Sequence, residues 1–508
     1  GPHGLRKQTR GADHVGLNVS VPATCFPTAS ALASSWDVNL LEEVGEALGR
    51  EAAAENVAVL LGPGINIKRH PLCGRNFEYY SEDPLLAGEL AAAFIRGVQS
   101  QGVGTSLKHY AVNNQERGRM VVDAVVDERS LREIYLRAFE IAVTRSQPWT
   151  VMCAYNRVNG TYCGEHDWLL NRVLRDEWGF EGLVVSDWGA TNDRVAGVAG
   201  GLDLEMPASG GANDRRVAEA VARGDLDEAV LDRAVARNVS LSLLGADLEA
   251  ADHPVDLDAH HRLARRVAAD CTVLLKNDGG LLPLETGLRL AVIGAFAKTP
   301  RYQGTGSSQV TPTRIDAAFD AITEHLGAEP VYAAGYDPRT GESEDALLEE
   351  ARAAAAEADA VLLFTGLPGI YESEGFDRAH LDLPAAHVAL IERVCAANAN
   401  VVVVLANGAP VSMAWVDLPA AILEGYLGGQ AGGAAMADVL FGTVNPSGRL
   451  AETFHMSLDA VGADAWFPGH GRQVQSRREG AVSLRLRALV HRIRLLGPRS
   501  VSDGDSCG

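Results

Sequence analysis

Carboxylates come at or shortly after the end of apolar, strand-like runs at two places in the sequence. In GLVVSDWGA, residues 182–190, the run ends at Asp187, and YESEGFDRAHLDLP, residues 371–384, carries Glu372 and Glu374 on one glycine-containing loop. An unpaired acid inside a buried strand is costly, so we expect Asp187 at the strand's end, where the strand meets a pocket. Glu372 and Glu374 are either ordinary surface charge or, if their loop reaches that pocket, the source of a general acid.

Two further segments carry clusters of hydrogen-bond donors. KHYAVNNQERGRM begins with Lys108 and His109 at the end of another strand-like run. Such a cluster suits sugar hydroxyls, which need donors and acceptors in fixed directions, but it also suits a solvated loop in which His109 caps a neighbour. In GPGINIKRHPLCGRNFEYYSEDP, Arg75 either pairs with Glu78 or Glu82 or reaches a ligand.

Alternating strand-like and helical stretches must position these side chains. From residue 38 to about 240 the alternation is typical of repeated βα units. The helical stretch from Asp127 has apolar residues at a helical period. Side chains that gather at the C-terminal ends of parallel strands are typical of a TIM barrel. The expected strands lie at 57–67, 104–112, 150–160, 182–190 and 201–207.

A second α/β unit is expected after an acidic, turn-rich segment. Its strand-like runs, at 289–297, 358–366, 400–408 and 420–428, are separated by helical stretches, which favours an open, mostly parallel sheet. We therefore predict a first domain over 1–244, a linker over 245–262 and a second domain over 263–470. Residues 471–508 are rich in arginine, and we expect a disordered or non-native tail there.

Composition excludes several classes of protein. The chain has 508 residues, 47% hydrophobic and 22% charged, with a net charge of -21. No apolar run reaches the roughly 18 residues of a membrane span, and the negative charge disfavours nucleic acid and anionic membranes. The seven cysteines form no CxxC pair, so neither a zinc site nor a disulfide framework is expected. A small neutral substrate and a cytoplasmic location are expected, and homo-oligomerisation is left open.

Several motifs, in order along the chain, resemble those of the family-3 glycoside hydrolases, and specifically their β-glucosidase branch. They are GPHGLR, PLCGRNFEYYSEDP, KHYAVNNQE, CAYNRVNG, GFEGLVVSDWGA, GLDLEMP and ESEGFDRAHLDLP. The resemblance covers residues 1 to about 470. It implies an α/β fold in which a TIM-type (β/α)8 barrel is followed by an α/β sandwich domain with a mostly parallel sheet.

The same resemblance assigns roles to individual residues. It implies that Asp187 is the catalytic nucleophile and that Glu374 is the general acid/base, with Glu372 as the alternative acid. The residues that it implies for sugar binding are Arg75, Lys108, His109, Arg119 and Tyr155, with Trp188 as an aromatic wall. It implies neither a metal nor an organic cofactor.

The implied activity is that of a retaining exo-β-glucosidase, which removes terminal β-D-glucosyl residues through a covalent glycosyl enzyme. A β-xylosidase or α-arabinofuranosidase of the same family, or a non-catalytic sugar-binding remnant, is the alternative. In a retaining enzyme the two carboxyl groups stand about 5 to 5.5 Å apart, one ionised and one protonated. We expect Lys108, His109 and the arginines to keep Asp187 ionised, while Glu374 stays protonated longer.

The sequence departs from the family pattern at both ends. Family members carry an Asp immediately before GPHG, where this sequence begins with Gly1. We therefore expect a barrel that is incomplete at its first strand and a weakened contact to the sugar. At the other end FPGHGRQV resembles the family, but the arginine-rich sequence after it does not.

Overall fold

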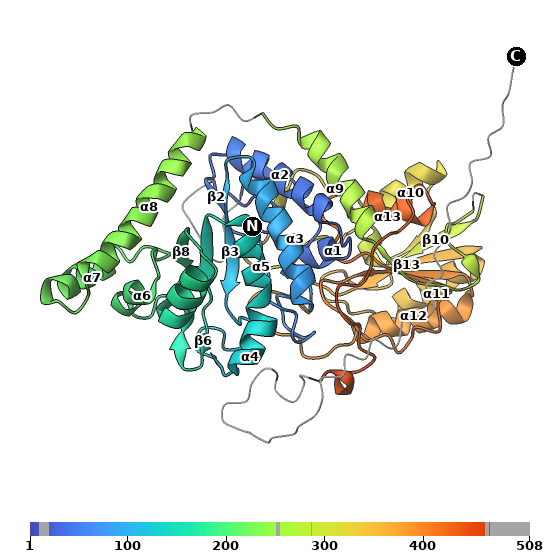
Figure 1. The fold of residues 1–508 in the computed structure, drawn as a ribbon. Helices are drawn as coiled ribbons and strands as arrows, with labels where there is room; N and C mark the ends of the chain where they lie inside the picture. The colour runs from blue at the N-terminus through green and yellow to red at the C-terminus, as the bar shows by residue number, and fades with distance from the viewer. Residues whose placement is uncertain (10–19, 250–253, 286, 463–466, 468–508) are drawn as a thin grey trace, which may run out of the picture.

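A computed structural model describes residues 1–9, 20–249, 254–285, 287–462 and 467. The two largest sheets lie in separate halves of the molecule (Figure 1). Residues up to 249 are called the first half, and residues from 254 on are called the second half. The predicted tail over 471–508 lies outside the described residues. In the part of the chain that the structure describes, no helix is both long and apolar enough to cross a membrane.

Four parallel strands form the sheet of the first half. They are β2 (Val59–Leu60), β3 (Gly104–Tyr110), β5 (Thr150–Cys153) and β8 (Leu183–Ser186), paired in that order. The helices between them are α3 (Pro84–Gln99), α5 (Arg137–Ser146) and η4 (Trp168–Glu177), with α2 (Val38–Ala54) before β2. Parallel neighbours end at one edge of the sheet, so residues that follow β3, β5 and β8 come together there.

The predicted α/β class is confirmed, whereas a closed barrel is not found among the described residues. The expected strand over 201–207 contributes a single parallel bridge, from Leu204 to Val185 of β8. Within the described chain, the sheet that contains β2 and β8 has these two strands at its edges. What is established is therefore a parallel sheet flanked by helices.

The second half is built on a six-stranded sheet in the order β12-β10-β13-β14-β15-β9. All neighbours are parallel except the edge strand β9, which runs antiparallel to β15. Nearly every residue of the central strands is buried, as expected for a sheet covered on both faces. The strands are β9 (Val273–Asn277), β10 (Leu290–Ile293), β12 (Val331–Ala333), β13 (Ala360–Gly366), β14 (Val401–Ala406) and β15 (Ala421–Glu424).

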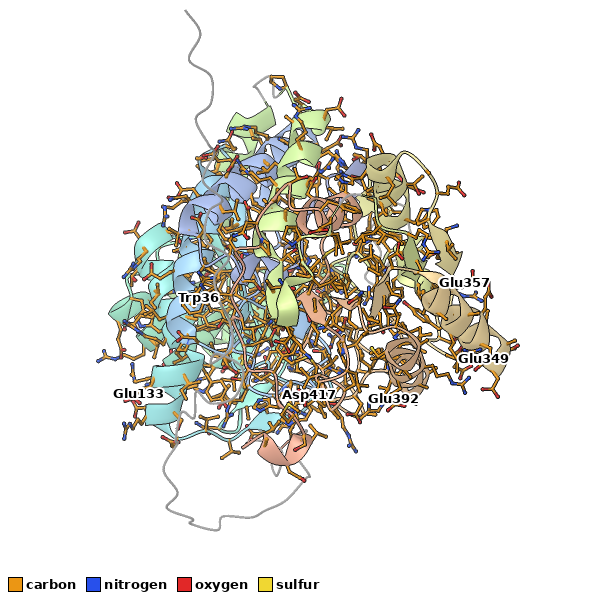
Figure 2. The ribbon with its side chains drawn as sticks, turned by 90° about the vertical axis from the view of Figure 1, so that its right-hand side faces the viewer. Trp36, Glu133, Glu349, Glu357, Glu392 and Asp417 are labelled. Atoms are coloured by element: carbon orange, nitrogen blue, oxygen red, sulfur yellow. The ribbon has the colours of Figure 1, made fainter. Side chains whose placement is uncertain are left out.

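Helices cover both faces of this sheet. Figure 1 shows α11 (Asp345–Glu357) and α12 (Ala385–Ala397) on one face, and α10 (Ala318–Leu326) and α13 (Gly432–Leu440) on the other. Acidic side chains on the outer helices, including Glu349, Glu357 and Glu392, point away from the body of the protein (Figure 2). This exposed acidic surface accords with the strongly negative net charge.

Two helices overlap the ends of the segment over 245–262, whose role as a linker stays a prediction. The helix α8 (Glu228–Glu249) continues into it, and α9 (Leu257–Cys271) begins before it ends. Asp256 caps α9, because its carboxylate accepts the backbone N–H of Ala259 at 2.9 Å.

The two halves also pair directly. The short strand β1 (Pro22–Ala23) runs parallel to β11 (Thr311–Pro312), which belongs to the second half. A small sheet of β4 (Asp123–Ala124), β6 (Arg157–Val158) and β7 (Thr161–Tyr162) extends the first half. The remaining elements are α1 (Ala29–Ala33), η1 (Asn76–Glu78), α4 (Glu128–Ser130), η2 (Leu131–Tyr135), η3 (Cys163–Glu165), α6 (Arg194–Gly200), α7 (Ala212–Arg223), η5 (Asp278–Gly280), η6 (Ala295–Ala297) and η7 (Leu458–Ala460).

Candidate active site

Asp187 lies at the edge where the first sheet's strands end. It follows β8 directly and is only 8% exposed. Its Oδ1 accepts a hydrogen bond from the Tyr155 hydroxyl at 3.0 Å and another from the Trp188 backbone N–H at 2.7 Å. These two donors fix the orientation of the carboxylate. Its other oxygen, Oδ2, lies 3.6 Å from His109 Nε2.

Lys108 and His109 reach the same place from the end of β3, two strands away. Both side chains are buried, and the Asn66 side chain bonds both the backbone N–H and the carbonyl of His109 at 2.9 Å. The Tyr79 hydroxyl lies 3.3 Å from His109 Nδ1. The interpretation of His109 as part of a solvated loop is therefore wrong, because the ring is held inside the site beside Asp187.

Glu374 enters this site from the second half of the protein. Its Oε1 accepts a hydrogen bond from Arg119 Nη1 at 3.0 Å and lies 3.7 Å from Arg75 Nη1. Its Oε2 accepts the backbone N–H of Ser307 at 2.7 Å. The loop that follows β13 therefore reaches across to side chains of the first half, and surface charge is excluded for Glu374.

Arg119 connects the two carboxylates. Its guanidinium carbon lies 5.0 Å from the centre of the Tyr155 ring, and the Tyr155 hydroxyl donates to Asp187. Arg119 also donates to Glu374. A continuous set of contacts thus runs from Asp187 through Tyr155 and Arg119 to Glu374, which brings both acids to one site.

Arg75 both pairs with a nearby glutamate and reaches the site, the two alternatives that the sequence left open. It is 1% exposed, forms a close ion pair with Glu78, and also faces Glu374. Glu82 has a different partner, since its Oε1 accepts a hydrogen bond from the Thr453 hydroxyl at 2.6 Å. Arg75 is thus a buried cation held in place by Glu78 and presented to the site.

Glu372, the alternative acid, points elsewhere. It is 1% exposed, and its Oε1 accepts the backbone N–H of Gly408 at 2.7 Å and lies 3.8 Å from Arg301 Nη2. Its pKa is raised by burial, which outweighs nearby Arg301. These contacts lie within the second half, which favours Glu374 over Glu372 as the group that works with Asp187.

Trp188 is half-buried and packs with the apolar side chains of Met152, Leu183 and Val185 on β5 and β8. Its backbone N–H is the part that contacts Asp187. The role of its ring as an aromatic wall stays a prediction.

The order of the two pKa values is opposite to the predicted one. Burial raises the pKa of Asp187 above its usual range, although Arg75, Lys108 and the two donors to the carboxylate oppose it. Burial alone would also raise the pKa of Glu374, but Arg75, Arg119 and the Ser307 bonds outweigh it and hold that pKa well below its usual range. The prediction was wrong because both arginines contact Glu374 rather than Asp187.

His109 does not add a positive charge beside Asp187. Burial, together with the neighbouring cations Arg75 and Lys108, lowers the pKa of His109 well below its ordinary value. The imidazole is therefore neutral at physiological pH, and Asp187 meets uncharged donors at hydrogen-bond distance.

Sequence reasoning missed three residues of this site. Glu116 accepts a hydrogen bond from Arg119 at 2.7 Å, Ser307 donates to Glu374, and Asp377 accepts backbone N–H groups from loops of the first half. Glu116 and Asp377 stand in the same motifs as Lys108 and Glu374, and this shared motif is the signal that was available. Ser307 lies 67 residues before Glu374 in the chain, and no local pattern links them.

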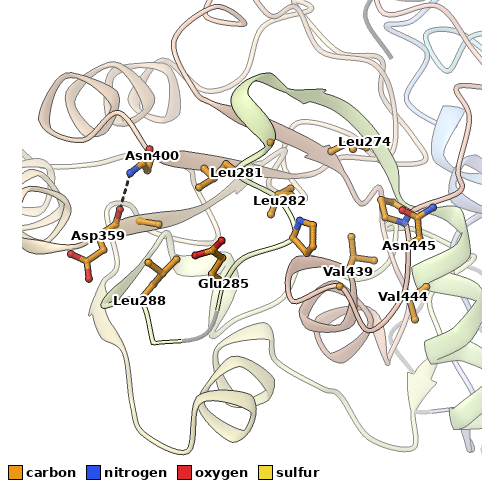
Figure 3. A pocket seen from close by; sticks show the side chains of 15 residues that line it. Leu274, Leu281, Leu282, Glu285, Leu288, Asp359, Asn400, Val439, Val444 and Asn445 are labelled. Carbon is orange, nitrogen blue, oxygen red and sulfur yellow. Dashed lines mark hydrogen bonds between the residues drawn. The ribbon is translucent and has the colours of Figure 1, made fainter. Parts of the chain in front are cut away.

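A separate pocket lies where the parallel strands of the second sheet begin, at the other end of these strands from Glu374. It measures about 780 Å³ and is lined mainly by apolar side chains, among them Leu281, Leu282 and Val439 (Figure 3). Asp359 and Asn400 line it too, and they precede β13 and β14, whereas Glu374 follows β13. The pocket is thus remote from the paired carboxylates. In the described residues no group of three or more His, Cys, Asp or Glu side chains is placed to hold a metal ion.

Comparison with known proteins decides the family. Residues 11–241 match the model of the glycosyl hydrolase family 3 N terminal domain, and residues 272–481 match that of the family 3 C-terminal domain. A GH3 β-glucosidase structure from Bifidobacterium adolescentis has a TM-score of 0.87 at 49% identity, covering 92% of this chain and 68% of that one. The chain belongs to glycosyl hydrolase family 3.

Two curated family 3 relatives are similar over most of this chain. Thermostable beta-glucosidase B of Acetivibrio thermocellus is 55% identical over 477 residues, which are 94% of this chain and 63% of that protein. An exo-alpha-(1->6)-L-arabinopyranosidase of Bifidobacterium longum is 50% identical over 471 residues, 90% of this chain and 62% of that protein. The chain thus spans somewhat less than two thirds of the length of these two relatives.

Proposed function

We propose that this chain is a retaining exo-β-glucosidase that hydrolyses terminal, non-reducing β-D-glucosyl residues. The observation that carries the proposal is the meeting of Asp187 and Glu374 at one site through Tyr155 and Arg119. The β-glucosidases among its relatives support this choice of substrate. A small-molecule glucoside or oligosaccharide is the proposed partner.

In the proposed reaction Asp187 Oδ2 attacks the anomeric carbon, because Oδ1 already accepts two hydrogen bonds. The bond from that carbon to the leaving oxygen breaks, and Glu374 transfers its proton to this oxygen. A water molecule then attacks the glycosyl enzyme while Glu374 accepts its proton, which releases the sugar and restores both groups. The sugar hydroxyls are held by Arg75, Lys108, His109 and the side chains beside them.

We also propose the finer architecture. The four parallel strands, with the bridge at Leu204, would belong to a TIM-type barrel over 1–244, and 263–470 would form the sandwich domain. The family 3 N- and C-terminal matches support a division between residues 241 and 272.

A second candidate activity is hydrolysis of α-L-arabinopyranosides. The relative from Bifidobacterium longum, which is 50% identical, carries this name. An arabinopyranoside is a pentoside without the C6 hydroxymethyl group of glucose. This candidate stands beside the β-xylosidase and α-arabinofuranosidase alternatives, which stay predictions.

The test is the rate of nitrophenol release from nitrophenyl glycosides by the purified 508-residue chain. We expect kcat/KM for the β-glucoside to exceed that for the β-xyloside and the α-L-arabinopyranoside by at least about tenfold, the discrimination that a few specific sugar contacts provide. A pentoside preference above about tenfold would overturn the glucosidase assignment. Sugar binding by calorimetry without any turnover would instead identify a non-catalytic remnant.

A further inference from the structure

The Asp377 carboxylate binds three backbone N–H groups, all of them in the first half of the protein. Oδ1 accepts from Gly74 at 3.1 Å and from Glu116 at 2.9 Å, and Oδ2 accepts from Arg117 at 2.9 Å. Asp377 itself belongs to the second half, three residues after Glu374. One side chain therefore fastens the Glu374 loop to two separate loops opposite it.

Glu116 makes the reciprocal contact. Its Oε2 accepts the backbone N–H of Gly375 at 2.7 Å and also a hydrogen bond from Arg119 at 2.7 Å. The Glu116 side chain is buried. Each half thus gives one carboxylate to the backbone of the other, and both contacts are made within the three residues that follow Glu374. We call Asp377 and Glu116 together the inter-half latch.

The loops joined by the inter-half latch touch closely. A Cβ atom at Gly74 would overlap the carbonyl oxygens of Ser373 and Phe376, so only glycine permits this approach. A further backbone bond runs from Arg378 N–H to the Leu72 carbonyl at 2.8 Å. Contacts with the first half therefore hold the Glu374 loop in addition to its bonds within the second half, such as the bond from Ser307 N–H to Glu374.

The loops that Asp377 binds are those that carry the two cations facing Glu374. Gly74 immediately precedes Arg75, while Glu116 and Arg117 precede Arg119. A carboxylate that merely capped its own loop, as Asp337 does with the N–H groups of Arg339 and Thr340, would not reach these segments.

We propose that Asp377 and Glu116 are positioning residues, which hold Glu374 at the distance from Arg75, Arg119 and Asp187 that proton transfer to the leaving group requires. This inference rests on the proposed function. The latch acts on the acid, whereas the nucleophile keeps its own contacts with Tyr155 and Trp188. Loss of the inter-half latch should therefore impair protonation of the leaving oxygen more than attack of Asp187 on the sugar.

The experiment compares two β-glucosides, one with an alkyl leaving group that needs protonation and one with a dinitrophenyl group that does not. We expect Asp377→Ala to lower kcat/KM for the alkyl glucoside about a hundredfold, as a misplacement of about 1 Å does, with a far smaller loss for the dinitrophenyl glucoside. Asp377→Asn should lie between Asp377→Ala and the unmodified protein. Asp337→Asn is the matched control and should change neither rate.

Equal losses on both glucosides, or no loss on either, would overturn the inference. Thermal unfolding shows whether each variant is folded, and Glu116→Gln supplies a second variant that must show the same selective loss on the alkyl glucoside. The proposed function fails separately, if the unmodified chain hydrolyses neither substrate. An active unmodified chain combined with equal losses in the latch variants would refute only the positioning role.

Discussion

Asp187→Asn should reduce kcat for aryl β-glucosides by at least about 10^4-fold, the order of loss seen when a side chain that carries out the chemistry is removed. The amide has nearly the same shape, and its oxygen can still accept the bonds from Tyr155 and Trp188. It cannot attack the anomeric carbon as a carboxylate does, so no glycosyl enzyme forms. The measurement is steady-state release of nitrophenol, with thermal unfolding to show an unchanged fold.

Asp193→Asn is the matched control for this change. Asp193 lies six residues further along and caps α6, with its carboxylate accepting the N–H groups of Val195 at 2.9 Å and Ala196 at 3.0 Å. Its replacement should leave kcat nearly unchanged. An Asp187→Asn protein that kept more than about one hundredth of the activity would contradict the nucleophile assignment.

Glu374→Ala should have an effect that depends on the leaving group. We expect kcat/KM for an alkyl β-glucoside to fall about 10^3-fold, within the range for loss of a general acid, with a much smaller fall for the dinitrophenyl glucoside. Azide should restore turnover of the dinitrophenyl substrate, since it attacks the glycosyl enzyme without needing a base. Product analysis should then show glucosyl azide.

Glu372→Gln separates the two candidate acids. Because Glu372 bonds to Gly408 and faces Arg301, its replacement should lower the free energy of unfolding. It should not lower kcat/KM for the alkyl glucoside more than kcat/KM for the dinitrophenyl glucoside. If the leaving-group dependence appeared in Glu372→Gln and was absent from Glu374→Ala, the acid would have to be reassigned.

The pH profile should change with Glu374 in a defined direction. In the sugar-free site the pKa of Glu374 is held well below its usual range and that of Asp187 is raised, so the form with Glu374 protonated and Asp187 ionised is lost as the pH rises. The unmodified protein should therefore lose kcat/KM on the basic side. With Glu374→Ala and the dinitrophenyl glucoside this basic limb should disappear, since only an ionised Asp187 is then needed.

Residues at or just after the C-terminal end of a strand could be predicted from the sequence, because the pattern that places them is local. Asp187 and Lys108 both stand at the end of an apolar run, and parallel strands bring such ends together. The choice between Glu372 and Glu374 was different, since residues two apart differ only in what they face. That choice depends on Arg119, which is 255 residues from Glu374 in the chain.

Other features could not be predicted because they depend on packing between the halves. The order of the pKa values follows from arginines that contact Glu374, and no sequence pattern specifies that contact. The inter-half latch likewise joins residues about 260 positions apart. The edge strand β9 was missed because it follows α9 almost directly, without a turn signal between them.

The most direct test of the central claim is to trap the covalent intermediate. Incubation of the 508-residue chain with a fluorinated glucoside, whose glycosyl enzyme hydrolyses slowly, should add one glycosyl group per chain. Mass-spectrometric sequencing should locate it on Asp187, and Asp187→Asn should remain unlabelled. A label on another residue, or hydrolysis that inverts the anomeric configuration, would contradict the account.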